Sequence, residues 1–225
     1  MKRSGLKIKA FTLVEMLVAI ALVALLAALI VPGIKTSLMK GQATRCLGHL
    51  RAISTGIAGY VADNGFYPGY RVTGEPVYWH QALVPYVDGN AVPKFSDPLL
   101  PWMTCPGRGD DRKEIGYGYN AYFGHVPPTA SDYVEAFGVY WQLRATAVQS
   151  PSQKIIIGDN KDFGTAGSYS KYQISRSGNP NNANHPRRHS GGGNFLFADG
   201  HLEWLTPREL TDRSKATGGM IFQPF

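Results

Sequence analysis

Cysteine is scarce in this chain of 225 residues, which contains only Cys46 and Cys105. Two cysteines cannot by themselves build a zinc finger, so that class of small metal-stabilised domain is excluded. In an exported protein the same pair can form one disulfide, and we predict a Cys46–Cys105 bond that fastens a loop region to a helix. The alternative is that Cys46 is a small apolar residue of the core.

Excess positive charge is also scarce outside the start of the chain. Four cations lie in the first ten residues: Lys2, Arg3, Lys7 and Lys9. They account for four of the seven net positive charges and leave +3 for the remainder. No dense Lys/Arg stripe follows, and we interpret Arg187-Arg188 as part of a solvated loop. Nucleic-acid binding is therefore not expected.

Motifs for catalysis and nucleotide binding are missing as well. The segment GYGYNAYFG, residues 116–124, lacks the Lys-Ser/Thr pair and the strand-to-helix setting of a phosphate loop. The glycine-rich HSGGGN, residues 189–194, leads into a predicted strand. No serine nucleophile elbow occurs, and nothing specifies a catalytic triad. We therefore expect no enzymatic activity.

Charge is almost absent from Phe11 to Val31, a run of 21 residues in which only Glu15 is ionisable. About 20 apolar residues in a helix cross the hydrocarbon core of a bilayer. Because cations precede the run, the amino end is expected to stay cytoplasmic and the rest to be exported. The alternative is a removed signal peptide, whose apolar region spans only about 7–15 residues.

The pattern after this run favours the anchored interpretation. Apolar residues recur at helical spacing, at Leu38, Cys46, Leu50, Ile53, Ile57, and Tyr60 or Val61. Asp63-Asn64-Gly65 then supplies a helix stop. The two segments read as one helix to about residue 62, with Pro32 and Gly33 as the place for a bend. A removed signal peptide has no reason to merge with such a helix.

Glu15 needs a partner, because an unpaired carboxylate in lipid is costly. No basic residue lies within reach on the same helix. If the chain is cut after Ala10, the new amino group of Phe11 lies four residues before Glu15. That amine, from the same chain or a neighbour, is a natural counter-ion. We predict that Glu15 acts in assembly and sets the axial register between packed subunits.

The segment KAFTLVEMLVAIALVALLAALIVP, residues 9–32, resembles the class III leader and first helix of type IV pilins and type II secretion pseudopilins. The shared features are a short basic leader, an aromatic residue after the cut, FTLVE, a hydrophobic helix and a proline near its far end. The resemblance implies cleavage between Ala10 and Phe11 by a membrane-embedded prepilin peptidase, followed by N-methylation of Phe11. Ala10 stands where the family usually has Gly, which predicts slower cleavage.

A second resemblance lies near the other end, where nine residues separate His189 from Asp199-Gly200. This is similar to the His-x9-Asp-Gly segment of prepilin-type proteins in planctomycete- and verrucomicrobium-like bacteria. Other segments also resemble those proteins: residues 46–70, 79–87, 103–107, 116–124 and 150–159. The resemblance implies an architecture and an export pathway more than a reaction.

The remaining patterns predict an α+β fold, with the long N-terminal helix packed on a small antiparallel sheet with long loops. The predicted elements are a helix at Tyr78–Val87, strands at Glu114–Phe123 and Ile155–Ile157, an exposed loop at 159–193, a hairpin of Asn194–Ala198 and His201–Leu205, and a helix capped by Thr206. Asp199-Gly200 is predicted to form a type I′ turn. The predicted organisation is a leader at 1–10, a transmembrane half-helix at 11–31 and an exported domain at 32–225.

The sequence offers two weak candidates for a metal site. Calcium prefers clusters of oxygen ligands, and Asp159, Asn160 and Asp162 form a weak one. A zinc site would need His189 and His201 to converge with Asp159 or Asp162. We predict instead that His189 bonds to the backbone of a loop or turn and that His201 is exposed. No metal or cofactor is assigned.

These features together favour a structural subunit of a type IV pilus-like or type II secretion pseudopilus filament. The implied partners are prepilin peptidase, other pilin-like subunits and an assembly platform in the inner membrane of a Gram-negative-type bacterium. The expected location is the inner membrane with an exported domain, or a filament after assembly. One alternative is an anchored binding module for polysaccharide or secreted substrate. A third interpretation is an anchored hydrolase that uses His189, Asp199 and His201.

Overall fold

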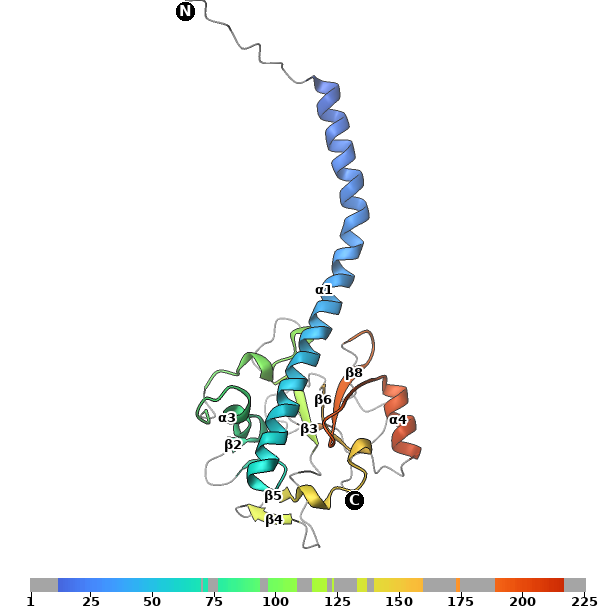
Figure 1. The fold of residues 1–225 in the computed structure, drawn as a ribbon. Coiled ribbons are helices and arrows are strands. Elements are labelled where there is room, and N and C mark those ends of the chain that lie inside the picture. Colours follow the sequence, from blue (N-terminus) through green and yellow to red (C-terminus); the bar gives the residue numbers. More distant parts are fainter. Residues whose placement is uncertain are drawn as a thin grey trace, which may run out of the picture. The chain divides into compact units, whose positions relative to one another are not determined.

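The computed structural model of the protein describes ten stretches of the chain: residues 12–69, 71–72, 77–93, 97–108, 115–120, 123, 133–136, 140–159, 173–174 and 189–216. For some of these residues, including 30–33, only the backbone is described. The chain divides into two compact units, Met1–Gly41 and Gln42–Phe225. The long helix α1, Leu13–Asn64, contributes to both units (Figure 1).

The first unit contains the amino-terminal part of α1. Every side chain described between Thr12 and Leu29 is exposed, and most of these side chains are large and apolar. Leu38 is 61% exposed, so the expectation that every apolar residue of the helical spacing packs on the sheet was wrong at this position. Among the described residues, no helix is both long enough and apolar enough to cross a membrane.

In the second unit, the remainder of α1 buries one face in the core. The buried residues follow the predicted spacing of three and four: Cys46, Leu50, Ile53, Ile57 and Tyr60. Val61 is half-buried, so Tyr60 is the core residue of that pair. The helix ends at Asn64, and Gly65 follows with a φ of 75°, a conformation that glycine adopts without strain. The predicted helix stop is confirmed.

Within the described part of the chain, the principal sheet has five strands in the order β7-β3-β6-β8-β9. Their bounds are Tyr117–Asn120 for β3, Ile155–Asp159 for β6, Gln173–Ile174 for β7, Gly193–Phe197 for β8 and Leu202–Leu205 for β9. The four strands from β3 to β9 are antiparallel neighbours, and the short β7 pairs with β3 in parallel. A long helix with a mainly antiparallel sheet confirms the predicted α+β class.

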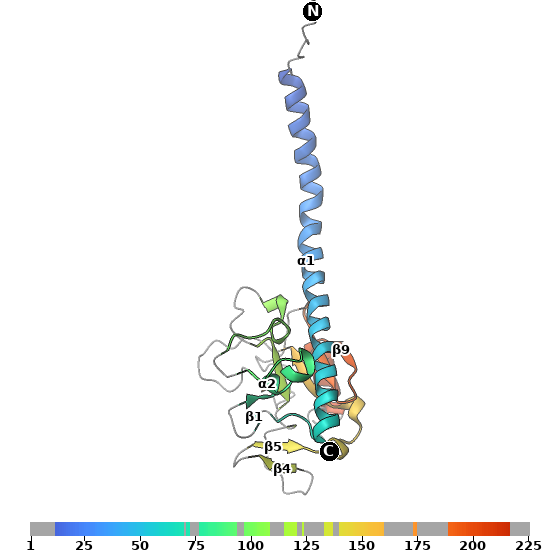
Figure 2. The ribbon, with the colours of Figure 1, turned by 60° about the vertical axis from the view of Figure 1, so that its left-hand side comes forward.

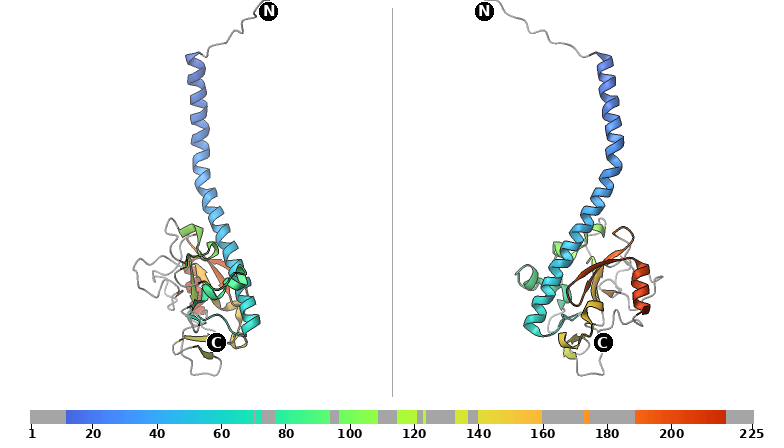
Figure 3. Two further views of the ribbon diagram at one scale, coloured as in Figure 1. Left: turned by 90° about the vertical axis from the view of Figure 1, so that its left-hand side faces the viewer. Right: turned by 45° about the vertical axis from the view of Figure 1, so that its right-hand side comes forward.

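The sheet lies between α1 and the helix α4, Pro207–Ala216 (Figures 1 and 3). Its α1 face joins the main core through Ile157 and Leu196, whereas Ile155 and Phe197 join a smaller core with Leu210 of α4. A register shift between Ile155 and Ile157 inserts an extra residue at that point. Such a bulge explains why Ile156 and Ile157 both belong to the main core, although neighbours on a regular strand point to opposite faces.

The turn between β8 and β9 differs from the predicted type. Asp199 does not have a positive φ, whereas Gly200 has a φ of 91°. The Phe197 N–H donates to the carbonyl of His201 at 3.0 Å, and the Gly200 N–H donates to that of Phe197 at 2.9 Å. This is a three-residue loop that ends in a left-handed glycine, so the type I′ prediction was wrong, although the hairpin itself is confirmed.

Smaller elements surround this framework. The helix predicted at Tyr78–Val87 is divided into α2, Trp79–Ala82, and α3, Val84–Val87. Pro85 explains the division, because it has no N–H to donate within a continuous helix but fits the first turn of α3. The short helices η1, η2, η4 and η5 occupy Pro101–Met103, Pro106–Arg108, Ala145–Ala147 and Pro151–Gln153.

Two small hairpins complete the described structure. They pair β1, Arg71–Val72, with β2, Val77–Tyr78, and β4, Tyr133–Ala136, with β5, Tyr140–Leu143. Figure 2 shows β4 and β5 beside the carboxyl end of α1, where Gln142 donates a 2.7 Å hydrogen bond to the Tyr60 hydroxyl. The sequence patterns predicted neither hairpin, and Tyr78 of β2 was expected to begin a helix.

Candidate functional site

The first α1 turn carries a reciprocal hydrogen-bond pattern between Thr12 and Glu15. The Thr12 N–H and hydroxyl both donate to Oε2 of Glu15 at 2.8 Å, and the Glu15 N–H donates to the Thr12 hydroxyl oxygen at 3.2 Å. This is a capping box, in which each residue satisfies a backbone donor of the helix start. The Glu15 carboxylate therefore has a partner within its own chain.

This capping role of Glu15 was not predicted, although the sequence carries its signal. Thr12 and Glu15 have the Thr-x-x-Glu spacing of a capping box, as do Thr206 and Glu209, which were recognised. The second pair has the same geometry, with distances of 2.8, 2.8 and 3.2 Å. The predicted processing residues Ala10 and Phe11 lie outside the described residues.

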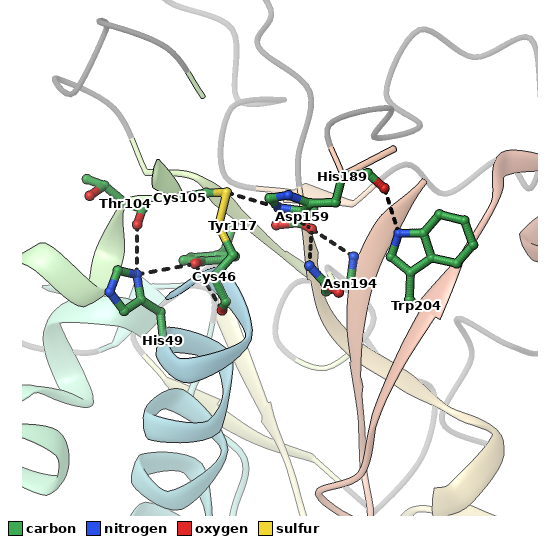
Figure 4. Close-up of polar contacts among 9 residues, drawn as sticks. All are labelled: Cys46, His49, Thr104, Cys105, Tyr117, Asp159, His189, Asn194 and Trp204. Atoms are coloured by element: carbon green, nitrogen blue, oxygen red, sulfur yellow. Dashed lines mark hydrogen bonds and ion pairs between the residues drawn. A yellow bond between two sulfur atoms is a disulfide. The ribbon is translucent and has the colours of Figure 1, made fainter. Parts of the chain in front are cut away.

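A buried cluster in the second unit begins with a disulfide between Cys46 and Cys105 (Figure 4). Cys46 lies on α1, and Cys105 lies between the short helices η1 and η2, 59 positions later. Their Cα atoms are 5.3 Å apart, and both side chains are buried. The bond fastens a loop segment to α1 within the core.

His189 and Asp159 complete the cluster. The His189 Nε2 lies 3.3 Å from Sγ of Cys105 and 3.4 Å from Oδ2 of Asp159. The His189 N–H also donates to the carbonyl of Gly192 in the adjacent turn at 3.3 Å, as predicted, whereas the contacts of its ring are with side chains. Both residues were also predicted to lie in an exposed loop, but both are buried.

Surrounding groups hold these two side chains in place. Oδ2 of Asp159 accepts hydrogen bonds from the backbone N–H of Asn194 at 2.7 Å and from its side-chain amide at 3.0 Å. The His189 carbonyl accepts a 2.9 Å hydrogen bond from Nε1 of Trp204. Gly107 lies so close that a Cβ there would be 2.8 Å from Cε1 of His189. The cluster is thus tightly packed and oriented by a second layer of contacts.

The hairpin turn does not join this cluster. Nδ1 of His201 lies 2.5 Å from Oδ1 of Asp199, and its ring stacks on Phe197 with centroids 4.2 Å apart. His189 is near the opposite end of β8, and five strand residues span on the order of 17 Å. The structure therefore does not bring His189, Asp199 and His201 together, which removes the arrangement that the hydrolase interpretation needed.

The structure also alters the set of candidate metal ligands. Asn160 and Asp162 of the calcium candidate lie outside the described residues, and Asp159 is buried beside His189. Potential ligand atoms of Cys46, Cys105, Asp159 and His189 all lie within 4.8 Å of one another. The sequence predicted the Cys46–Cys105 pair and offered His189 and Asp159 as possible zinc ligands, but not the convergence of the two pairs. Their members come from four distant segments with none of the short spacings typical of a zinc motif.

Several large aromatic side chains of the second unit lie in the core. Trp79, Tyr117, Tyr119 and Phe123 are fully buried. The rings of Trp79 and Tyr119 stack on each other within the core, with centroids 5.4 Å apart. These four residues therefore serve packing and are not a platform for sugar rings.

Comparison with known proteins identifies one motif. Residues 6–31 match the prokaryotic N-terminal methylation motif. The match includes Ala10, Phe11 and Glu15 and is consistent with a type IV pilin-like or pseudopilin-like protein, whereas the His189 to Gly200 segment lies outside it. No curated protein and no solved structure gave a significant match.

Proposed function

We propose that this chain is a structural subunit of a type IV pilus-like or type II secretion pseudopilus filament and assembles through its N-terminal helix. The methylation motif at residues 6–31 carries this proposal. The motif supports a pilin-like or pseudopilin subunit in general, and the filament role is our specific inference from it. No catalytic role is assigned to any residue.

The first unit presents a large apolar surface. Leu13, Val23 and Leu29 are 76%, 65% and 71% exposed, and the intervening side chains are exposed too. A large apolar surface of this kind needs lipid or other protein to cover it. Copies of one chain that associate head to tail without closing a ring form a filament. Packing between copies of this helix is therefore the expected basis of assembly.

The motif also supports a route to the assembled state. We infer that the basic leader ends at Ala10, that prepilin peptidase cuts there, and that Phe11 is then N-methylated. Before assembly, Phe11–Val31 is proposed to lie in the inner membrane with residues 32–225 exported, on the basis of its apolar sequence and the preceding cations. Other pilin-like subunits and an inner-membrane assembly platform are the proposed partners.

The deciding experiment is intact mass and N-terminal analysis of the chain produced with its native peptidase. The expected product begins at N-methylated Phe11 and lacks ten residues. A chain that still begins at Met1 would contradict processing and would indicate a permanent anchor. A cut after the apolar run would contradict assembly through that helix, because the helix would be lost.

The alternative of a binding module has one specific observation in its favour. A cavity of about 320 Å³ lies between the end of α1 and the β8–β9 turn, and its lining includes Ser54, Tyr67 and Asp199. This volume is at the lower end for small-ligand sites. Binding of glycans to the full chain, with loss of binding in Tyr67→Phe or Asp199→Asn, would favour this alternative.

A further inference from the structure

We propose that Cys46, Cys105, Asp159 and His189 form a zinc site in the reduced chain, and that the Cys46–Cys105 disulfide and the bound zinc are mutually exclusive states of one buried cluster. The proposed ligand atoms are the two sulfur atoms, a carboxylate oxygen of Asp159 and Nε2 of His189. This site is independent of the filament proposal and of any residue in the methylation motif.

The donor set suits zinc. Zinc in proteins binds cysteine thiolates, imidazole nitrogen and carboxylate oxygen, with four tetrahedral ligands in structural sites. Thiolates favour zinc over magnesium and calcium, which prefer oxygen ligands. The four side chains are buried, so a metal there has no open position for substrate. The geometry therefore points to a structural ion.

The distances fit a tetrahedron of the right size. Bond lengths of about 2.3 Å for sulfur and about 2.0–2.1 Å for nitrogen and oxygen place neighbouring ligands roughly 3.3–3.8 Å apart. Nε2 of His189 already lies 3.3 Å from Sγ of Cys105 and 3.4 Å from Oδ2 of Asp159, and all ligand atoms lie within 4.8 Å of one another. The two sulfur atoms must separate once their bond is broken, and any ligand pair near the 4.8 Å limit must approach more closely.

The second layer of contacts also matches a metal site. The Asn194 N–H and side-chain amide hold Oδ2 of Asp159 at 2.7 and 3.0 Å. Zinc with two thiolates and one carboxylate has a net charge of −1, and these donors lie where they stabilise that charge. The Trp204 hydrogen bond fixes the backbone of His189. Such outer contacts orient metal ligands and raise affinity.

The two states interconvert by a balanced reaction. Metal binding to the reduced chain releases one proton from each thiol as the two zinc–sulfur bonds form. With oxidised glutathione as oxidant, the two thiolates give up two electrons, form the Cys46–Cys105 bond and release Zn²⁺. The glutathione disulfide accepts those electrons and leaves as two glutathione thiolates. A reducing compartment favours the zinc state, and an oxidising one favours the disulfide.

The test uses the full chain in detergent, purified with a phosphine reductant and without chelator. Titration with Co²⁺ is expected to give the visible bands of a tetrahedral thiolate site at one equivalent per chain. Competition with Zn²⁺ then gives the zinc affinity. Oxidised glutathione is expected to remove both the spectrum and the metal, with two thiols lost per chain.

Substitutions test whether His189 and Asp159 bind the zinc together with the two cysteines. His189→Ala and Asp159→Asn are each expected to weaken zinc binding by more than the roughly 10–100-fold that loss of an outer-layer contact costs. His201→Ala is the matched control, because this exposed histidine lies on the β8–β9 turn, away from the cluster. The zinc affinity of this variant should equal that of the wild type. Unchanged affinity in both ligand variants would overturn the proposal.

The folded state must be followed in parallel by circular dichroism. If the reduced, metal-free chain stays folded, failure to bind one equivalent overturns the proposal. If that chain loses structure, zinc is expected to restore the native spectrum, because binding and folding are then coupled. A reduced chain that unfolds and does not recover with zinc would equally overturn it.

Discussion

At the scale of single residues, a very close backbone approach occurs where Gly116 meets Cys105. A Cβ on Gly116 would lie 2.3 Å from the backbone nitrogen of Cys105, which cannot move aside as a flexible side chain can. Gly116→Ala is therefore expected to lower the free energy of unfolding by about 3 kcal/mol, at the upper end for overpacking. Urea unfolding followed by tryptophan fluorescence would measure the change.

The matched control is Gly48, on α1, whose added Cβ would meet no atom within 4 Å. Gly48→Ala is expected to raise the free energy of unfolding by about 0.5–1 kcal/mol, because alanine favours a helix interior. Equal stability of the two alanine variants would contradict the packing described around Cys105.

His80 makes stability depend on pH. Its side chain is 4% exposed, and burial lowers its pKa from 6.5 to about 3. The folded chain keeps this imidazole neutral, whereas the unfolded chain protonates it below pH 6.5. The free energy of unfolding should therefore fall as the pH drops from 6.5 toward 3, with a contribution of about 2 kcal/mol between pH 6.5 and 5.

The variant His80→Gln isolates this contribution. Its free energy of unfolding should depend on pH less steeply than that of the wild type between pH 6.5 and 5, and the two slopes should coincide above pH 7.5. Denaturant titrations at each pH measure both slopes. Parallel curves over the acidic range would show that His80 is not buried in its neutral form.

At the scale of the elements, the start of α1 combines a helix cap with the carboxylate proposed for assembly. Glutamine can replace glutamate in a capping box, but it has no charge to pair with the amino group of a cleaved Phe11. Glu15→Gln is therefore expected to keep the helix start and to reduce filament assembly at least tenfold, as Glu15→Ala should. Sedimentation of assembled material, normalised to membrane-bound subunit, gives the comparison.

Thr12→Ala is the matched control for this pair. It removes the hydroxyl that accepts from the Glu15 N–H but leaves the carboxylate in place. Assembly of this variant near the wild-type level would support the charge. If Glu15→Gln assembled normally and Thr12→Ala lost assembly, Glu15 would instead act only as a capping residue.

The elements that the sequence predicted well are those governed by local rules. The spacing of Cys46 to Tyr60 specified the buried face of α1, and Thr206 with Glu209 specified the start of α4. The bulge at Ile156 and the approach of His189 to Asp159 depend on contacts between distant segments. The spacing of apolar residues along the chain does not predict such contacts, so the buried cluster could be found only in the three-dimensional structure.

At the scale of the whole molecule, the two units differ in what their side chains contribute: an exposed apolar surface in one and the folded core in the other. The first unit presents apolar side chains without a core of its own among its described residues. The second unit contains both hydrophobic cores and the disulfide. Substitutions in the cluster around Cys46 should therefore change stability, whereas those near Glu15 should change assembly.

The disulfide supplies a stability test for the second unit. Its two cysteines are 59 positions apart, and closing a loop of that size contributes about 4 kcal/mol in the chain-entropy model. Reduction with a phosphine, with a chelator present to exclude metal, should lower the free energy of unfolding by about that amount. The Cys46→Ser/Cys105→Ser double variant should lose a similar amount and be insensitive to the reductant. Identical urea midpoints before and after reduction, with both thiols then open to alkylation in urea, would show that the bond does not constrain the unfolded chain.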